Sequence, residues 1–537
     1  MVKCINYYSI MSFLSFPYFI TLFILELLLH DSVSDTYNYI PLLFFVFSFI
    51  IVLIFLYIGN IKKHETILYL LYYLSSVCAI SLEDLPFVII AFEVMALSAI
   101  MIIASESCGI NQKSVIHYSC IHFLAGVLLL IGMSGETLNM INIFSMEYNN
   151  YYKLFILVGI LINCACLPLS SWVPDAYSST SHHSIIVLSV FTTKVSAFIL
   201  LCFFQGEKIL LFLGIATSIY GIVFSILENS IKRLLCYNLV GQMGLVITAI
   251  GFSYNIGTDI RGIIVLQLIL SIAYQTLLFM VAISVINSTK KFNISEVGKL
   301  FTKMPIEAIG SIVAILNMGA FPGTGGFVSK FLITHSVNNA DFTNVLISKL
   351  FLGCSILLFV SVGVKFFWFT FISKVVDNSI IKKVNLGSRI SILTLTVILL
   401  YFGILGHYSL FDKLSRTELH SAVLQCVLQC GLVFGGVLFF ICFRSVFRGR
   451  INFEMDIDWI YRVLFMRIIS LANDFLLCVH SILVTILSNT LSKSTLLYSK
   501  ANEKVMSISN VSSLGLTIML AMSFIIIMVI VYLCLNL

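Results

Sequence analysis

The sequence predicts an all-α, polytopic membrane protein, and composition is the first reason. Hydrophobic residues make up 60% of the 537 residues and charged residues only 10%, against roughly 45–50% and about 25% in soluble domains. The mean hydropathy of +1.06 is correspondingly high. At about 20 residues per bilayer crossing, the apolar content is enough for roughly 14–16 transmembrane helices. This excludes a soluble enzyme, a nucleic-acid-binding domain and a singly anchored receptor.

Apolar stretches bounded by polar loops are the second reason, and they define the expected spans in chain order. The first stretch is interpreted as a span, because no small-residue cleavage site of a removable signal follows it. The spans cover residues 9–30, 39–59, 66–82, 85–104, 115–135, 152–169, 184–204, 208–227, 234–253, 262–286, 306–335, 345–372, 388–406, 420–443 and 514–536.

The positive charges of the loops are the third reason, because they alternate with the spans. Nine basic residues fall in loops on one side and three in loops on the other. A Lys/Arg excess marks the cytoplasmic side, so the N-terminus is predicted to lie inside. The nine are Lys62, Lys63, Lys113, Lys232, Arg233, Lys290, Lys291, Lys299 and Lys303, and the three are Lys153, Lys208 and Arg261.

Proline and glycine interrupt two of the apolar stretches. Such breaks are tolerated at membrane depth only where protein or a water-filled cavity satisfies the freed backbone groups. A pair of interrupted helices in two halves of a chain indicates a repeat-built transporter and its ion site. The alternative is that both are ordinary loops. The first break contains Pro168, Trp172, Pro174 and Asp175, and the second contains Pro322, Gly323 and Gly326.

Glu93 and Lys194 lie near the centre of predicted spans, and Lys330 lies within the second interrupted span. Each costs at least ~2.5–3.5 kcal/mol to insert, so each is a candidate functional residue. Burial disfavours the charged form of both carboxylates and ammoniums, which suits groups that gain and lose protons. Glu93 and Lys194, if adjacent, would form a pair whose separation captures or releases a proton. The alternative is a static buried ion pair that only fixes helix packing.

Histidines give weaker signals. His117 and His122 lie on one span but five residues apart, which favours local hydrogen bonding over a proton relay. His182 and His183 follow the first break and could carry protons from the surface, although a solvated position near a loop is the simpler interpretation.

Other basic residues lie near span ends, where snorkelling to the interface explains them. These are Lys232, Arg233 and Lys365. The sequence contains no phosphate-binding loop, His/Cys ligand spacing or nucleophile elbow. We therefore expect neither a cofactor nor a metal site.

Six motifs in this order resemble the proton-translocating antiporter family. Its members include the antiporter-like membrane subunits of respiratory complex I and the large subunits of Mrp-type Na⁺/H⁺ antiporters. The resemblance covers roughly residues 65–375. The motifs are Asp84 with Phe92-Glu93-Val94, residues 136–140, Pro168-Leu169 through Trp172-Val173-Pro174-Asp175-Ala176, Thr193-Lys194-Val195, residues 231–235 with Gln242-Met243-Gly244, and Phe321-Pro322-Gly323 with residues 326–330.

The resemblance implies a fold of two inverted five-helix repeats, each with one broken helix. It also implies that Glu93 occupies the position of a glutamate that pairs with a lysine in the first broken helix. Lys194 and Lys330 match lysines that continue a polar axis through the membrane centre, and Lys232 matches a further lysine of the pattern.

The chain departs from the family pattern at two places. Asn163 stands where the family usually has a lysine, five residues before the first break's proline. The central span carries Gln267, Ser271 and Gln275 where histidines and a lysine are usual. Amides hydrogen-bond but do not titrate, so two proton-carrying positions are replaced.

Two late segments, 363–369 and 456–462, look more like the long D-type proteins among the Mrp antiporter's large subunits than like complex I subunits. The expected function is therefore that of one membrane subunit of a multi-subunit monovalent cation/proton (Na⁺/H⁺) antiporter. It would lie in the cell's inner (plasma) membrane beside other small and large membrane subunits, without nucleic acid. The alternatives are a proton-pumping subunit of an NADH:quinone oxidoreductase and a degenerate scaffold subunit.

Four segments follow from these patterns. Residues 1–64 are expected to form N-terminal transmembrane helices, residues 65–375 the antiporter-like core, and residues 376–443 additional spans. Residues 444–537 are expected to combine an amphipathic segment with a C-terminal span. The alternation of apolar and polar positions over 459–498 is typical of a helix lying along a membrane or a partner subunit, and a tilted extra span remains the alternative.

Overall fold

The computed structural model describes residues 39–59, 61–82, 84–105, 112–134, 151–252, 260–335, 342–373, 384–413 and 416–448, with six single positions between 467 and 477. The predicted spans 9–30 and 514–536, residues 136–140 and most of the segment 459–498 lie outside the described residues. The chain divides into two units, 1–459 and 460–537, and the fold described below is that of the first.

Helices account for every regular element among the described residues. Within the described ranges, ten helices are long and apolar enough to cross a membrane, and two apolar helices are shorter, Tyr151–Asn163 and Pro305–Met318. The prediction of an all-α polytopic membrane protein is therefore confirmed. The elements are α2 (Ile40–Ile58), α3 (Lys63–Ser81), α4 (Leu85–Ser105), α5 (Gln112–Met133), α6 (Tyr151–Asn163), η3 (Val173–Tyr177), α7 (Ser184–Val190), α8 (Thr192–Phe203), α9 (Lys208–Leu227), α10 (Ile231–Phe252), α11 (Ile260–Thr289), η5 (Ile294–Glu296), α12 (Pro305–Met318), α13 (Gly325–His335), α14 (Phe342–Leu358), η6 (Phe359–Val364), α15 (Lys365–Phe367), η7 (Trp368–Ile372), α16 (Leu386–Lys413) and α17 (Arg416–Phe447).

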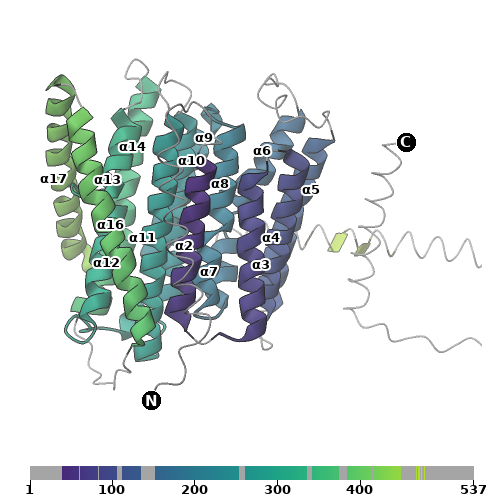
Figure 1. The fold of residues 1–537 in the computed structure, drawn as a ribbon, viewed down its shortest axis with the longest axis horizontal. Coiled ribbons are helices and arrows are strands. Elements are labelled where there is room, and N and C mark those ends of the chain that lie inside the picture. The colour runs from purple at the N-terminus through teal and green to yellow at the C-terminus, as the bar shows by residue number, and fades with distance from the viewer. Residues whose placement is uncertain are drawn as a thin grey trace, which may run out of the picture. The chain divides into compact units, whose positions relative to one another are not determined.

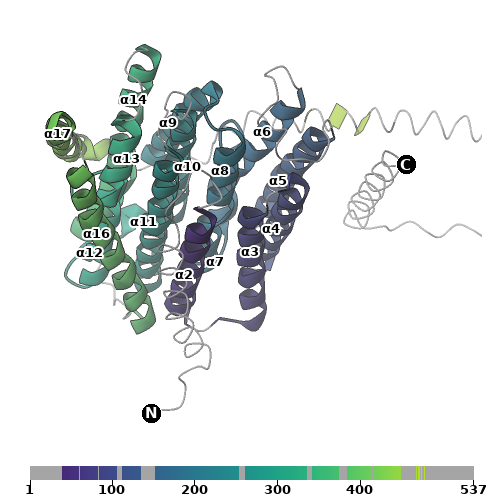
Figure 2. The same cartoon turned by 45° about the horizontal axis from the view of Figure 1, so that its top comes forward.

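The order of long and broken helices occurs twice. Three long helices, α3 to α5, precede the broken element α6/η3, and α7–α8 then forms the fifth member. In the second series α9 to α11 precede the broken element α12/α13, and α14 continues through η6, α15 and η7. Within the unit, α3, α4 and α5 stand at one end of the helix row and α17 at the other (Figures 1 and 2).

The most buried helices, α10 and α11, belong to the second series. The apolar windows of α10 and α11 are completely buried inside the protein, whereas that of α17 is only 17% buried. α8 packs against α6, α10 and α11, and α11 packs in turn against α13. A continuous set of helix contacts therefore leads from the first broken helix to the second.

Both breaks use the same backbone geometry. An alanine in the left-handed region follows the helix end in each, with φ of 58° at Ala165 and 54° at Ala320. The next amide reaches back five residues at 3.0 Å in both cases, from Cys166 to the Leu161 carbonyl and from Phe321 to the Leu316 carbonyl. This is the hydrogen-bond pattern of a Schellman motif, which ends a helix and satisfies its last carbonyls only in part. The two predicted breaks are real helix ends.

Loops predicted to share one side do meet there. The amide of Ile231 donates to the carbonyl of Phe292 at 3.0 Å, and that of Lys299 donates to the carbonyl of Ser373 at 2.9 Å. The Lys232 ammonium reaches the Thr180 carbonyl at 2.6 Å. The predicted helix alternation therefore agrees with the contacts in these loops, while the assignment of this side to the cytoplasm stays a prediction.

Candidate functional site

Lys194 is held at the end of a half-helix inside the protein. Phe191, with φ of −98° and ψ of −69°, separates α7 from α8. The carbonyl of Ser189 belongs to the last turn of α7, where helical carbonyls lack helical partners. Lys194 is 1% exposed, and its ammonium donates a hydrogen bond to this carbonyl at 2.9 Å. No ion pair among the described residues includes Lys194.

Lys330 is held in the same way at the second break. Its Nζ donates to the carbonyl of Met318, the last residue of α12, at 2.5 Å, and to the hydroxyl of Ser355 on α14 at 2.7 Å. The side chain is 0% exposed. The C-terminal end of a helix carries a partial negative charge, so both lysines are stabilised by helix dipoles and not by acids.

Glu93 lies on α4 against α5. Its carboxyl group fills the space above Gly126, where a Cβ atom would lie 2.9 Å from the Glu93 carboxyl carbon and closer still to Oε1. The side chain is half-buried. Among the described residues Glu93 takes part in no ion pair, so the structure does not join it to Lys194.

Asn163 is the last residue of α6 and lies near His122 on α5, the helix that also carries Gly126. His122 lies one turn from Gly126 and close enough to Asn163 for an electrostatic interaction. Both side chains are buried, yet His122 Nε2 and Asn163 Oδ1 make no hydrogen bond. Trp172 closes the other side by donating from Nε1 to the Ile162 carbonyl at 3.2 Å. Two buried polar atoms without a hydrogen-bond partner therefore lie at the position where the family pattern has a lysine.

Buried amides lie on α10 and α11, between the two lysine-bearing helices. Gln242 accepts a hydrogen bond from Tyr274 at 2.8 Å and Gln267 accepts one from Ser329, next to Lys330, at 2.6 Å. The NH₂ groups of both glutamines and the whole amide of Gln275 have no partner. A buried polar group without a partner costs about 1–3 kcal/mol, which water can offset where the site is polar.

The first break carries an ion-pair network at η3, its C-terminal part. Asp175 lies 3.4 Å from His117 and 3.5 Å from Arg233, and Arg233 lies 3.1 Å from Glu228. Glu228 accepts from the amides of Asn229 and Ser230 at the start of α10. Asp175 therefore links α5 to α10 and lies apart from the buried lysines.

The prolines and glycines of the breaks shape the backbone. The Leu167–Pro168 bond is cis, Pro174 is the second residue of η3, and Gly323, which follows Pro322, has φ of +91°. At Gly326 a Cβ would lie 2.8 Å from the Asn317 carbonyl carbon. The Gly326 amide instead donates to Asn317 Oδ1 at 3.3 Å, so only glycine lets α13 pass this close to α12. Asp84 acts through its backbone carbonyl, which accepts from the amides of the first turn of α4.

The snorkelling interpretation is wrong for Lys365. The residue is 1% exposed. Its ammonium donates hydrogen bonds of 2.6–2.9 Å to three carbonyls at the end of α9, those of Ser225, Ile226 and Glu228. Lys232 is half-buried on Thr180, and Arg233 is engaged in the network described above.

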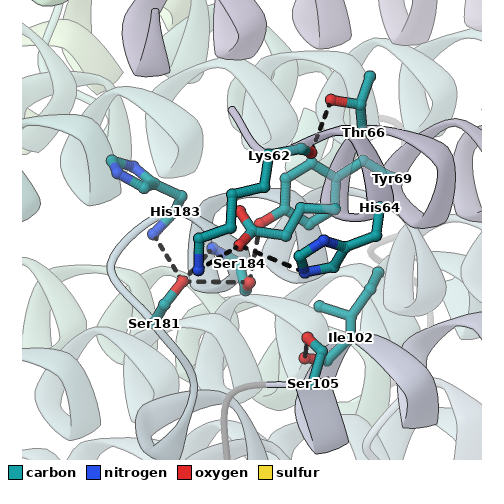
Figure 3. A network of polar contacts seen from close by, with 10 residues as sticks. Lys62, His64, Thr66, Tyr69, Ile102, Ser105, Ser181, His183 and Ser184 are labelled. Carbon is teal, nitrogen blue, oxygen red and sulfur yellow. Dashed lines mark hydrogen bonds and ion pairs between the residues drawn. The ribbon is translucent and has the colours of Figure 1, made fainter. Parts of the chain in front are cut away.

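Hydroxyl groups lead from the surface toward Lys194. Figure 3 shows the Tyr69 hydroxyl and Ser184 pointing toward each other, with Ser181 next to Ser184. The Tyr69 and Ser184 oxygens lie 2.9 Å apart, and Ser181 donates to Ser184 at 3.2 Å. One turn further along α3, Tyr72 is hydrogen-bonded to Thr192, two residues before Lys194.

The two loop histidines are half-buried and not freely solvated. His182 stacks on Phe292 with ring centroids 5.9 Å apart. Burial, followed by the positive charge of Lys232, lowers the pKa of His182 from 6.5 to about 4. His182 is therefore neutral at pH 7.

Several of these partners are not identified by the patterns in the sequence. Ser355, Tyr72 and Gly126 acquire their roles from residues on other helices, 25 or more positions away in the sequence. Glu228 pairs with the nearby Arg233, and its local signal is an acidic residue immediately after the predicted span 208–227.

Comparison with known proteins identifies a family and a fold. The sequence profile described as NADH:quinone oxidoreductase/Mrp antiporter, TM, matches residues 82–358. NADH-quinone oxidoreductase subunit N of Pelagibacter ubique is 26% identical over 287 residues, which are 49% of this chain and 60% of the relative. NADH-quinone oxidoreductase subunit M of Buchnera aphidicola is 30% identical over 197 residues, 35% of this chain and 38% of the relative. The chain thus spans three fifths or less of these two curated relatives.

Solved structures share the fold at low sequence identity. A chain of the Mrp complex from Dietzia sp. matches with a TM-score of 0.61 and 16% identity, over 78% of this chain and 86% of that one. A chain of the membrane-bound sulfane sulfur reductase, an archaeal respiratory membrane complex, matches with a TM-score of 0.61 and 18% identity, over 91% and 88%. Both belong to multi-subunit membrane complexes.

Proposed function

Because this chain belongs to the NADH:quinone oxidoreductase/Mrp antiporter transmembrane family, we propose that it is the proton-carrying membrane subunit of a multi-subunit monovalent cation/proton antiporter of the Na⁺/H⁺ type. Its partners would be other small and large membrane subunits, and its place a cell's inner (plasma) membrane. The match to a chain of the Mrp complex supports this assignment at the level of the fold.

One observation carries the proposal. Two buried ammoniums lie on α8 and α13, and the helices between them, α10 and α11, carry buried amides without hydrogen-bond partners. Lys194 and Lys330 are held by helix-end carbonyls and a hydroxyl, without an acidic partner among the described residues. Neutral partners leave an ammonium free to lose its proton without stranding a buried carboxylate. The unpaired amides of Gln242, Gln267 and Gln275 would bind the water that carries the proton between them.

In this proposal Glu93 binds the exchanging proton, Lys194 responds to its charge and Lys330 passes the proton to the far side. The hydroxyls of Tyr69, Ser184 and Tyr72 supply the access from the surface. The amides at positions 163 and 275 hold water in place of a titrating group.

Proton flux measured in vesicles that contain the assembled complex tests the proposal. We expect Glu93→Gln and Lys330→Met each to lower cation-dependent proton flux at least tenfold. Lys349→Ala, which changes an exposed lysine on α14, is the matched control and should keep wild-type flux. Wild-type flux in both site variants would overturn the assignment.

A second candidate function is a proton-pumping subunit of a quinone-linked oxidoreductase. The identity to NADH-quinone oxidoreductase subunits N and M favours it. Co-purification with redox subunits and quinone-dependent pumping would support this function, whereas cation-driven flux without a quinone would contradict it.

A scaffold subunit without transport is the third candidate, suggested by Asn163. Asn163→Lys should then leave the complex unchanged in every flux assay. A gain or change of flux in this variant would count against a purely structural role.

A further inference from the structure

A second buried carboxylate lies outside the polar axis, in the first turn of α12. Glu307 is 0% exposed, and neither of its carboxyl oxygens has a hydrogen-bond partner. Arg389 on α16 is the nearest opposite charge, with Nε 3.7 Å from Oε1. That nitrogen also makes no hydrogen bond, so the two groups face each other without the close geometry of a static buried ion pair.

Few other titratable or charged groups face this carboxylate among the described residues. From α2, Tyr57 interacts with it electrostatically, but the Tyr57 hydroxyl already contacts the Met280 carbonyl and Ser284 on α11, each at 2.9 Å. From α16, Arg389 faces it. α15 contributes Lys365, whose ammonium is committed to the end of α9.

Arg389 differs from Glu307 in its access to water, because 37% of its side chain is exposed. An ionised Glu307 needs the guanidinium, since a buried carboxylate without a partner is costly. A protonated Glu307 is neutral and does not need it, and the guanidinium can then turn to solvent. The site thus has two forms that differ by one proton and by the position of Arg389.

Three polar side chains of α12 and α16 lie between this site and the second break, and each donates to a carbonyl of its own helix. Ser311 lies one turn along α12, and Thr396 of α16 lies beside Gly310, its hydroxyl 3.3 Å from where a Cβ would be. Asn317 follows near the break, next to the Met318 carbonyl that binds Lys330. All these side chains are buried.

We propose that Glu307 is a proton-binding site in the first turn of α12. Arg389 is its counter-charge: ionised Glu307 binds the guanidinium, and protonated Glu307 releases it. The ligand is a proton and not a metal ion, because the guanidinium would repel a cation. The carboxylate gains H⁺ to become a carboxylic acid, and no other bond changes. The delivery of this proton to Lys330 rests on the proposed function, whereas its binding does not.

Infrared difference spectroscopy of the purified full-length protein tests the binding step without any transport. Lowering the pH should produce a carbonyl band of a protonated carboxyl group that is present in wild type and missing in Glu307→Gln. Glu296→Gln, which changes an exposed carboxylate in a loop of the same side, is the matched control and should keep the band. Identical spectra in all three proteins would overturn the proposal.

Arg389→Gln provides a second test that leaves Glu307 in place. Removing the counter-charge should enlarge the protonated-carboxyl band at pH 7, and the added intensity should vanish in the double variant with Glu307→Gln. An unchanged band in Arg389→Gln would refute the role of Arg389.

Flux assays separate this inference from the proposed function. If Glu307 delivers protons, Glu307→Gln should lower flux severalfold while Glu296→Gln does not. The spectroscopic band with no flux in any variant supports proton binding and contradicts the proposed antiport. Antiport without the band contradicts only the inference.

Discussion

A single added methyl group at Gly126 tests the position of the Glu93 carboxylate. In Gly126→Ala the new Cβ would lie 2.9 Å from the Glu93 carboxyl carbon, whereas ordinary contacts are 3.4–4 Å. The carboxyl carbon must therefore retreat from 2.9 to at least 3.4 Å, and the nearer oxygen must retreat further. The obstacle is the end of a flexible side chain, so the fold should lose no more than about 1–3 kcal/mol.

The effect on transport should be much larger than the effect on stability. Misplacement of a reacting group by about 1 Å can cost roughly 100-fold in rate. We expect Gly126→Ala to lower proton flux about 10- to 100-fold while the complex still assembles. Flux in vesicles and the thermal midpoint of the purified complex measure the two effects separately.

Gly353→Ala is the matched control, because its Cβ on α14 would meet no atom within 4 Å. It should leave both flux and midpoint near wild type. If Gly126→Ala transports as well as Gly353→Ala, the carboxylate does not need this position, and the reasoning about Glu93 fails.

Three further predictions concern the neighbouring groups. Ser355→Ala removes one of the two partners of the Lys330 ammonium, a charge-assisted bond of about 1.5–3 kcal/mol; flux should fall tenfold or more, and unchanged flux would show that the Met318 carbonyl suffices. Asp175→Asn leaves the half-buried Arg233 with one acid instead of two and should lower stability by about 1–2 kcal/mol, between exposed and buried pairs; an unchanged thermal midpoint would contradict this. The pKa of His182 is lowered to about 4 in the folded protein but lies near 6.5 in the unfolded chain. The free energy of unfolding should therefore fall as the pH drops from about 6.5 to 4. His182→Gln should flatten this pH dependence, and a profile identical to wild type would contradict the prediction.

The architecture of the chain is largely predictable from its sequence. Apolar stretches of bilayer length fix the spans, and proline with glycine fixes the two breaks, because both signals are local. The three ionisable residues within spans stand out for the same reason, since charge in such stretches is costly. The structure places Lys194 next to the end of α7, at the interruption at Phe191, and Lys330 next to the end of α12, at the second break.

The partners of these groups could not be predicted in the same way. The Ser355 contact with Lys330 depends on how α13 and α14 cross, and the Gly126 contact depends on the depth of α4 against α5. Lys365 illustrates the limit most clearly. Its position near a span end suggests snorkelling, yet the end of α9 lies close enough to take its charge. Sequence spacing does not reveal which helix end a lysine will meet.

The kind of partner chosen for Lys194 and Lys330 limits where their protons can go. A carboxylate beside an ammonium can accept its proton, and the two then remain as a neutral couple that holds the proton in place. A peptide carbonyl is far too weak a base to do so. A proton that leaves either lysine must therefore pass to water or to the next titrating side chain. It cannot stay on the group that binds the ammonium.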